Sequence, residues 1–267
     1  MIRFLQLSIS VFLLFILYAP LARIFFASVN VDRTGNTWGG FTLQWFRALY
    51  EDSAAKSALA NSLVLAFVSA FISLVLGVML AMAWSAMKRS QATKVFHLVF
   101  AALTIPDIVL AAALLLFFGM MREKMGLFEL GLPTMIMAHA TFQLPLVALV
   151  IRSRLAAMDP TILDAARDLG ANQQQLFYRI QLPFLRPALV VAFLLCFTSS
   201  IDDFIISFFT SGPGSTTLPI FTYSSVKRGI TPEVNALSAL VILAAGLTVV
   251  FIACWKQGRR TLIHIAS

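Results

Sequence analysis

Residues 59–87 have the sequence LANSLVLAFVSAFISLVLGVMLAMAWSAM, a run of 29 positions without a charged side chain. A helix needs about 20 apolar residues to cross the hydrocarbon core of a bilayer, so this run is long enough to span it. Lipid offers no partner to backbone N–H and C=O groups, and a continuous helix pairs them internally. The run therefore predicts a transmembrane helix.

The composition of the whole chain agrees with lipid as its solvent. Of the 267 residues, 60% are hydrophobic and 12% are charged, and the mean hydropathy is +0.88. The net charge of +8 does not indicate nucleic-acid binding, because the 20 Lys and Arg residues are spread over short interhelical segments. Cys196 and Cys254 lie inside apolar runs, so neither a disulfide framework nor a thiolate metal site is expected.

Six hydrophobic segments have roughly the length of a spanning helix. They cover Leu5–Ala27, Leu59–Met87, Val95–Met121, Leu132–Ile151, Pro187–Phe209 and Ala236–Trp255. We therefore expect an all-α polytopic protein with six transmembrane helices, forming a single transmembrane domain over residues 1–267. The first segment follows Arg3 as in a signal peptide, but its length favours an uncleaved signal-anchor.

The basic residues predict the orientation of these helices. In one set of alternate connections Lys and Arg dominate, whereas the other set also carries many Asp and Glu residues. The basic positions of the first set are Arg3, Lys88, Arg89, Lys94, Arg152, Arg154, Arg167, Arg179, Arg186, Lys256, Arg259 and Arg260. Connections rich in Lys and Arg stay in the cytoplasm, so both termini are expected there.

The connection 152–186 is the longest on the cytoplasmic side, and its pattern predicts an ordered structure. Asp159 can cap a helix that has Pro160 at its first position, and Gly170 can end it. Four residues spaced three and four apart give this short helix a narrow apolar face: Ile162, Ala165, Ala166 and Leu169. Such a face favours docking into a groove.

A second helix should follow in the same connection. Asn172 can cap it while Gln175 reaches back in a capping box, and Pro183 is expected to end it before the next span. The alternative is an amphipathic hairpin that lies on the lipid surface.

The same connection resembles the EAA signature of ABC importer permeases, a MetI-like family. The residues that carry the resemblance are Asp164, Ala165, Ala166, Gly170, Ile180, Gln181, Leu182 and Pro183. The family usually has Glu at the first position, and Asp164 is a conservative departure. The resemblance implies that Pro160–Leu169 is a coupling helix seated in a cytoplasmic ATPase, with Leu169, Gly170, Ile180, Leu182 and Pro183 contributing to the coupling.

The chain has no G-x-x-x-x-G-K-[ST] phosphate loop, so it is not expected to hydrolyse ATP by that route or to carry a cofactor of its own. The resemblance implies that the chain lies in a bacterial inner membrane and has several partners there and on both sides of it. They are a dimer of ATP-binding cassette ATPases, a second permease that is homologous rather than identical, and an extracytoplasmic solute-binding protein.

Three carboxylates lie within the expected spans, where ionisable groups are costly and usually face a cavity or a partner. They are Asp107, Asp202 and Asp203, and on straight helices they would lie at similar depths. Together they would form a negative constriction suited to a cationic solute. Alternatively, Asp107 caps a helix broken at Pro106, and one of the paired aspartates caps another helix or bonds a neighbour. Adjacent residues cannot share a helix face, so at most one of the pair should face a pathway.

Four further segments resemble the C-type permease of spermidine/putrescine importers: Ile105–Val109, Ser200–Asp203, Ser211–Gly214 and Thr231–Leu237. The resemblance implies a polyamine substrate, for which acids and aromatic faces are suitable partners. Phe221 and Tyr223, together with Trp38 and Trp45, could meet the substrate or a delivering protein from external loops. Interfacial anchoring is the alternative role of these aromatic residues.

Two other classes of protein are less consistent with the sequence. A membrane-embedded enzyme would need a nucleophile with a base, a metal cluster or a cofactor loop, and we identify none. His97 and His139 lack a second ligand at metal spacing, which favours hydrogen bonds between helices. An ion-coupled secondary transporter could use intramembrane aspartates, but such proteins commonly show two related halves, and no internal repeat is evident.

Overall fold

The computed structural model describes residues 2–33, 37–229 and 232–247. Among them the regular structure is helical, apart from one isolated bridge between Asn30 and Phe41. The chain divides into two compact units, Met1–Lys56 with Thr222–Ser267, and Ser57–Phe221. The expectation of an all-α protein is confirmed, and each unit is described by itself.

The first unit contains α1 (Ile2–Ser28), α2 (Gln44–Glu51) and a helix over Pro232–Leu247. Helix α1 covers the first expected span, and its apolar side chains are exposed, as for a helix that faces lipid. Trp45 of α2 is buried, and its Nε1 donates a hydrogen bond to the Asn30 carbonyl at 2.7 Å. The last expected span begins within Pro232–Leu247, and its remainder lies outside the described residues.

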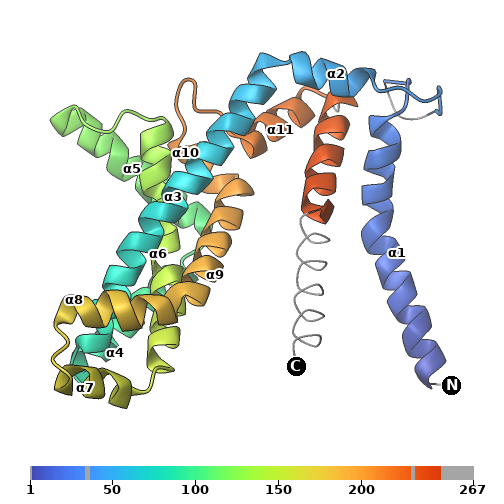
Figure 1. The fold of residues 1–267 in the computed structure, drawn as a ribbon. Helices are drawn as coiled ribbons and strands as arrows, with labels where there is room; N and C mark the ends of the chain where they lie inside the picture. Colours follow the sequence, from blue (N-terminus) through green and yellow to red (C-terminus); the bar gives the residue numbers. More distant parts are fainter. Residues whose placement is uncertain (1, 34–36, 230–231, 248–267) are drawn as a thin grey trace. The chain divides into compact units, whose positions relative to one another are not determined.

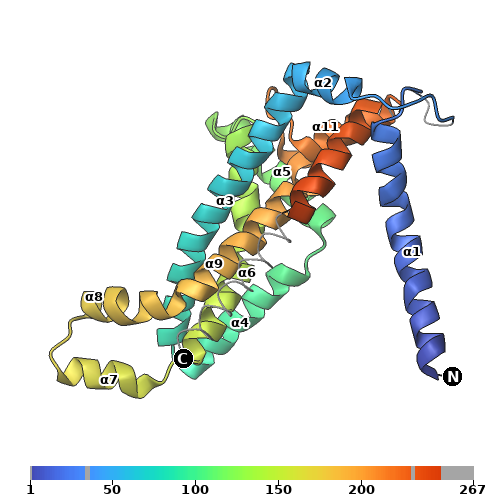
Figure 2. The ribbon, with the colours of Figure 1, turned by 45° about the vertical axis from the view of Figure 1, so that its right-hand side comes forward.

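The second unit is built around three long helices, α3 (Ser53–Ala86, beginning in the first unit), α6 (Leu132–Ala156) and α9 (Leu182–Ile201), which run side by side in Figures 1 and 2. A cluster of buried apolar residues packs between these helices: Ala70, Ala81, Val147, Ile151, Leu185, Ala192 and Cys196. A Cβ atom on Gly77 would lie 2.5 Å from Val147, so glycine is required where α3 meets α6.

The third expected span is not one continuous helix. It consists of α4 (Arg89–Thr104) and α5 (Asp107–Met125), which meet at an angle of 99°. The expected continuous helix over Val95–Met121 is therefore wrong, and the broken helix that the sequence left open is present. Pro106 causes the break because it lacks a backbone N–H and keeps the preceding residue extended, as Ile105 is.

The fifth expected span, Pro187–Phe209, is also not a single helix in the structure. Its helical run begins at Gln173, ends at Ile201 and is followed by the short α10 (Ile205–Thr210). A second apolar cluster joins α10 to α5 and α6 through Ala111, Phe118, Ala138 and Ile206. The chain then turns through Ser211–Gly214 into α11 (Leu218–Lys227).

The connection between α6 and α9 forms a helical hairpin. It contains α7 (Pro160–Asp168), α8 (Gln173–Gln175) and the π-helix η1 (Leu176–Gln181). The expected end of the second helix before Pro183 is wrong, because η1 continues directly into α9. The wider π turn lies next to Pro183 and accommodates a residue that cannot donate a backbone hydrogen bond.

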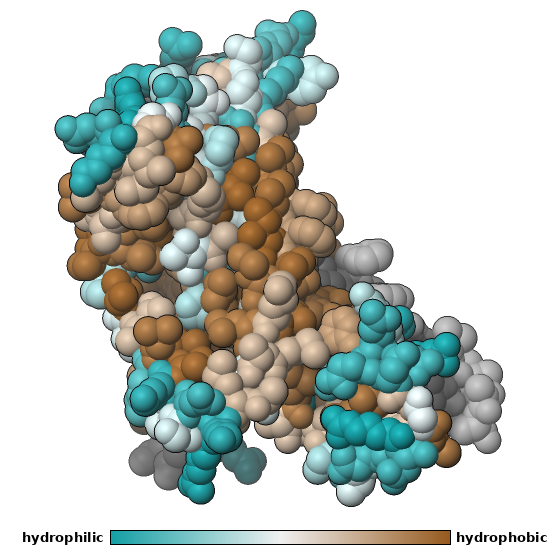
Figure 3. Space-filling view, turned by 90° about the vertical axis from the view of Figure 1, so that its left-hand side faces the viewer, coloured by the Kyte–Doolittle hydropathy of each residue, from teal (hydrophilic) through white to brown (hydrophobic). Residues whose placement is uncertain are grey.

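Among the described residues four helices are long and apolar enough to cross a membrane, or five if α4 and α5 count as one span. On the face of the second unit seen in Figure 3, hydrophobic side chains form a broad band with hydrophilic side chains gathered at its ends. This distribution is that of a protein whose middle contacts lipid.

Candidate functional site

Two helix breaks bring the candidate acids together. At the first, Pro106 precedes Asp107, which is the first residue of α5 and lies in its first turn, where the helix dipole favours a negative charge. At the second, Asp202 and Asp203 lie between the end of α9 and the start of α10. Helix α10 packs against α5, so the two breaks are neighbours within the second unit.

A cavity of about 460 Å³ lies at these breaks. Its lining consists of Asp107, Phe142, Ser199, Asp202, Asp203, Phe204, Ile205 and Ile206. All three acids that the sequence singled out therefore line one cavity, which also has two aromatic side chains in its wall. The straight-helix depths on which the expectation rested do not apply, because both acidic positions lie at breaks.

The two adjacent aspartates have different environments. Asp202 is exposed, and its side chain has no hydrogen bond or ion pair within the described part of the chain; the same holds for Asp107. Asp203 instead turns inward, where the backbone N–H groups of Ser207 and Ile206 donate to its carboxylate at 2.8 and 3.3 Å. Asp203 thereby caps the start of α10, a role that the sequence left open for one member of the pair.

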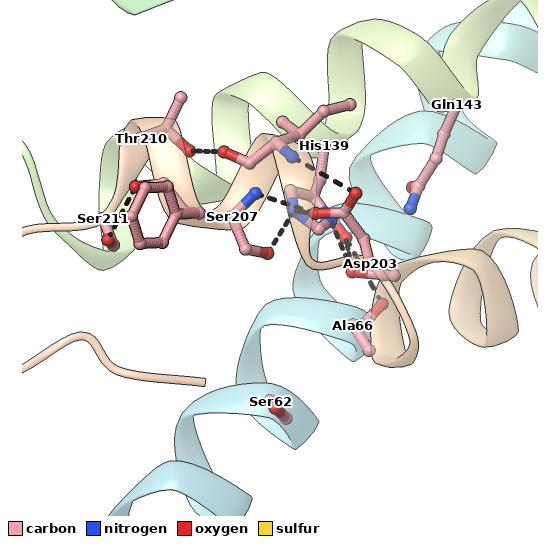
Figure 4. Close-up of polar contacts among 12 residues, drawn as sticks. Ser62, Ala66, His139, Gln143, Asp203, Ser207, Thr210 and Ser211 are labelled. Atoms are coloured by element: carbon pink, nitrogen blue, oxygen red, sulfur yellow. Dashed lines mark hydrogen bonds and ion pairs between the residues drawn. The ribbon is translucent and has the colours of Figure 1, made fainter. Parts of the chain in front are cut away.

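Asp203 also meets His139 of α6, as Figure 4 shows. The imidazole Nε2 lies 3.3 Å from Asp203 Oδ2 and 3.0 Å from Ser207 Oγ, while Nδ1 lies 2.7 Å from Ser200 Oγ. The His139 side chain is fully buried, so these contacts are made away from solvent. As the sequence favoured, His139 makes hydrogen bonds between helices.

The polar contacts continue across the bundle as a buried seam. Ser200 Oγ lies 3.3 Å from Ser69 Oγ of α3, and Ser73 Oγ donates to Gln143 Oε1 at 2.9 Å. Gln143 Nε2 in turn donates to the Cys196 carbonyl at 3.0 Å. The seam links α3, α6, α9 and α10 by side chains that lipid could not satisfy.

The grouping of Ser200, His139 and Asp203 has the residue types of a hydrolytic triad, a constellation that the sequence did not suggest. Ser200 is only 3% exposed and His139 is fully buried, so a substrate carbonyl has no access to the hydroxyl. Within the described residues no cluster of three or more His, Cys, Asp or Glu side chains could hold a metal ion. The contacts serve to hold four helices in register.

The hairpin of α7 has the geometry that its sequence predicts. The Asp159 side chain accepts a hydrogen bond from the Thr161 backbone N–H at 2.9 Å, and Gly170 ends the segment with a left-handed φ of 84°. No residue of α7 is buried, and Ile162 and Leu169 are 50% and 89% exposed. Ile162 and Leu169 are thus largely open to solvent, whereas Leu163 and Ala166 are half-buried.

The remaining residues of the EAA-like pattern lie close by. Asp164 forms an exposed ion pair with Arg167 at 2.7 Å, Ala165 is exposed and Ala166 is half-buried. In the other arm, η1 contacts α7, and Ile180, Leu182 and Pro183 are half-buried at the junction of η1 with α9. The arm that contacts α7 is thus joined to α9 as one helical run, Gln173–Ile201, whereas α7 is separated from it by the turn at residues 169–172.

The aromatic candidates are not part of the acidic cavity. Phe221 and Tyr223 both belong to α11, and neither lines the cavity. Tyr223 falls in the first unit, where the Lys227 ammonium lies 5.2 Å from the centre of its ring. Trp45 is buried by its own unit, whereas Trp38 is exposed.

Sequence reasoning missed several polar residues of the spans. Ser69 and Ser73 are fully buried on α3 one helical turn apart, and Gln143 lies one turn after His139 on α6. Polar residues that recur on one face of an otherwise apolar helix are the signal that could have found them. Arg23 in the first expected span was also overlooked; it is exposed and lines a cavity of the first unit beside Trp38.

A known family of membrane transport components matches the greater part of the chain. The family described as "Binding-protein-dependent transport system inner membrane component" matches residues 73–257, more than half of the chain. The chain belongs to this family. It is a multi-pass inner-membrane permease component of an ABC importer, with the MetI-like permease fold that the EAA-like pattern implied.

Curated relatives cover nearly the whole permease. The putrescine transport system permease protein PotI of Escherichia coli strain K12 is 38% identical over 245 residues, which are 91% of this chain and 87% of PotI. The spermidine/putrescine transport system permease protein PotC of Haemophilus influenzae is 36% identical over 227 residues, 85% of this chain and 86% of PotC.

Solved structures agree on the fold. A chain of a bacterial ABC transporter involved in the import of the acidic polysaccharide alginate superposes with a TM-score of 0.76 at 15% identity, covering 97% of this chain and 95% of that one. A chain of the MetNI methionine ABC transporter in an inward-facing conformation gives a TM-score of 0.57 at 19% identity, covering 76% and 95%. At these identities the likeness concerns the fold alone.

Proposed function

We propose that this permease carries polyamines, lines half of the translocation pathway and binds the cation at the cavity between the two helix breaks. The observation that carries the proposal is that Asp107, Asp202 and Asp203 line one cavity although they come from two separate breaks. A polyamine is a flexible chain of ammonium groups, and carboxylates are the partners that offset such charges best.

The cavity has a second property that suits this substrate. Phe142 and Phe204 stand in its wall, and aromatic faces attract ammonium groups while the alkyl segments of a polyamine pack against apolar carbon. The names of the relatives support the same substrate class, because PotI is a putrescine permease and PotC a spermidine/putrescine permease. For Phe221 and Tyr223 we propose substrate contact at another stage of transport.

The hairpin of α7 supports coupling to an ATPase on a partner chain. The helix is capped by its own sequence, none of its residues is buried, and its apolar side chains offer a docking face. The connections rich in Lys and Arg, which include the hairpin of α7, stay on the cytoplasmic side of the membrane. The docking face of α7 and both termini are therefore in the cytoplasm. ATP is then used by an ATP-binding cassette dimer, and an extracytoplasmic binding protein delivers the solute to a pair of homologous permeases.

The proposal is tested by removing charge from the cavity without changing its shape. Asp202→Asn combined with Asp203→Asn is expected to abolish putrescine uptake by cells that express the complete transporter, because the cavity keeps only the carboxylate of Asp107. Membrane insertion and assembly with the companion chains should be retained, as measured by co-purification. Unchanged uptake would remove the acidic site from the mechanism.

The coupling role is tested separately, on the exposed hairpin. Replacing Ala165 and Ala166 by Leu should stop uptake with the protein still inserted, because the docking face no longer fits its groove. Arg167→Lys, on the opposite side of the same helix and with the charge kept, is the control and should retain uptake. Labelling of cysteines placed at Thr161 or Leu169 from outside intact cells would contradict the cytoplasmic placement.

A further inference from the structure

The carboxylate of Asp203 is held by three contacts from inside the protein, out of the about four that a carboxylate can accept. Oδ2 accepts from the Ser207 backbone N–H at 2.8 Å and lies 3.3 Å from His139 Nε2, while Oδ1 accepts from the Ile206 backbone N–H at 3.3 Å. A carboxylate can only accept, so the proton of the imidazole lies on Nε2, where it is shared between Asp203 and Ser207. Asp203 therefore has little left to offer a ligand.

The other two acids of the cavity are in the opposite situation. Asp107 and Asp202 are both exposed, and no described side chain or backbone donor satisfies either carboxylate. Burial separates the two kinds of acid, because the Asp203 side chain is only 10% exposed. Three acids line the cavity, yet only two present unsatisfied negative charge to it.

We propose that His139 is a specificity-determining positioning residue, which holds Asp203 inward so that the cavity presents two carboxylates, those of Asp107 and Asp202, to a substrate with two ammonium groups. This inference rests on the proposed function, and it names the diamine as the substrate that the cavity favours over a triamine. His139 acts through Asp203 and does not touch the substrate itself.

The contacts of His139 explain why this residue can perform that role. Its Nδ1 is anchored by Ser200, which reaches α3 through Ser69, and its ring stacks edge-on against Phe142 with centroids 5.3 Å apart. The imidazole therefore has one orientation, with Nε2 aimed at the start of α10. A side chain that lacks a donor at this position would leave Asp203 held by the two backbone N–H groups of α10 alone, so its carboxylate could turn toward the cavity more easily.

The test measures the ratio of putrescine to spermidine uptake in one preparation of the complete transporter, with the companion proteins unchanged. A ratio does not depend on how much variant protein is folded. His139→Ala should shift it toward spermidine by about fivefold, the factor for one additional charge contact worth about 1 kcal/mol. His139→Gln keeps a donor near Asp203. Its ratio of putrescine to spermidine uptake should therefore stay within about twofold of that of the unsubstituted protein, because the carboxylate remains held inward.

A double variant separates charge from packing. His139→Ala with Asp203→Asn removes the freed carboxylate, so the ratio should return toward its original value even though the void at position 139 remains. An unshifted ratio in His139→Ala, or a shift that Asp203→Asn does not reverse, would overturn the inference. If His139→Ala does not insert into the membrane, the variant Asp203→Asn decides the question. Its ratio of putrescine to spermidine uptake should equal that of the unsubstituted protein. A change in this ratio as large as that caused by Asp202→Asn would overturn the inference.

Failure of the inference and failure of the proposed function look different. If Asp107→Asn and Asp202→Asn transport both polyamines normally, the cavity is not the substrate site and the proposed function fails. If those variants lose uptake while His139→Ala leaves the ratio unchanged, the acidic site stands and the role of His139 is refuted.

Discussion

The two helix breaks beside the cavity look alike but have different causes. The break before Asp107 is built into the covalent chain, because Pro106 cannot donate a backbone hydrogen bond and keeps Ile105 extended. The break after Ile201 contains no proline or glycine. It is held by Asp203, which caps α10 and pairs with His139 on a different helix.

The difference shows where this permease can change shape. A break caused by proline persists whatever its neighbours do, whereas a break held by side-chain contacts depends on the relative positions of α3, α6, α9 and α10. Movement of α9, which is continuous with the hairpin of α7, would strain the second break first. The exposed Asp202 lies at that break, so access to the acid can be coupled to helix movement.

The largest expected effect comes from removing the contact that holds the second break. Asp203→Ala loses a helix cap, worth about 1 kcal/mol. It also removes the charged acceptor of the buried imidazole, whose Nε2 then keeps only Ser207 Oγ at 3.0 Å, and this costs about 1 kcal/mol more. Thermal unfolding of the purified protein in detergent should show this loss. Asp202→Ala, the adjacent exposed residue, is the matched control and should change stability by less than about 0.5 kcal/mol. Equal losses would mean that Asp203 does not hold the break.

A smaller effect is expected at the break caused by proline. Pro106→Ala should lower stability by only about 0.4–1 kcal/mol, through the greater freedom of the unfolded chain. The packing of Ala111 and Phe118 against Ile206 still directs α5. The same thermal measurement checks this prediction. A loss as large as that of Asp203→Ala would show that this packing does not direct α5 once Pro106 is removed.

The features that could be predicted from sequence are those with local causes. The start of α7 follows from Asp159 and Pro160, its end from Gly170, and the next capping box from Asn172 with Gln175, and all of them are confirmed. Each depends on a single residue or on residues at most three positions apart, so the sequence contains the whole interaction. The apolar runs likewise predicted the helices, since burial in lipid needs only length and hydropathy.

The features that could not be predicted depend on residues far apart in the chain. Nothing between Asp202 and Phe204 interrupts a helix by itself, so the expected span ran on through the break. The contact that creates the break joins Asp203 to a residue 64 positions earlier, His139. Pro183 gave the opposite error, since it signals a helix end locally but is accommodated beside η1.

Asp159 performs the same task as Asp203 but in water, which allows the two caps to be compared. The Thr161 backbone N–H donates to the Asp159 carboxylate, and this hydrogen bond holds the pKa of Asp159 below its usual value. Because the pKa is lower in the folded protein than in the unfolded chain, the cap contributes fully above the unfolded pKa of about 3.9. The contribution is lost as the pH falls through the folded pKa.

This gives the smallest expected effect, a loosening of the first turn of α7 in acid. Hydrogen exchange of the Thr161 and Ile162 amides in the purified protein should accelerate below about pH 4 relative to Asp159→Asn, whose amide caps without titrating. Taking the ratio of the two proteins at each pH removes the intrinsic pH dependence of exchange. For amides at the start of α10 the ratio of the two proteins should not change with pH, because both proteins keep the Asp203 cap there. A ratio that stays constant with pH would mean that the hydrogen bond of Asp159 contributes nothing to the order of α7, and that its exposed docking face is held by Pro160 alone.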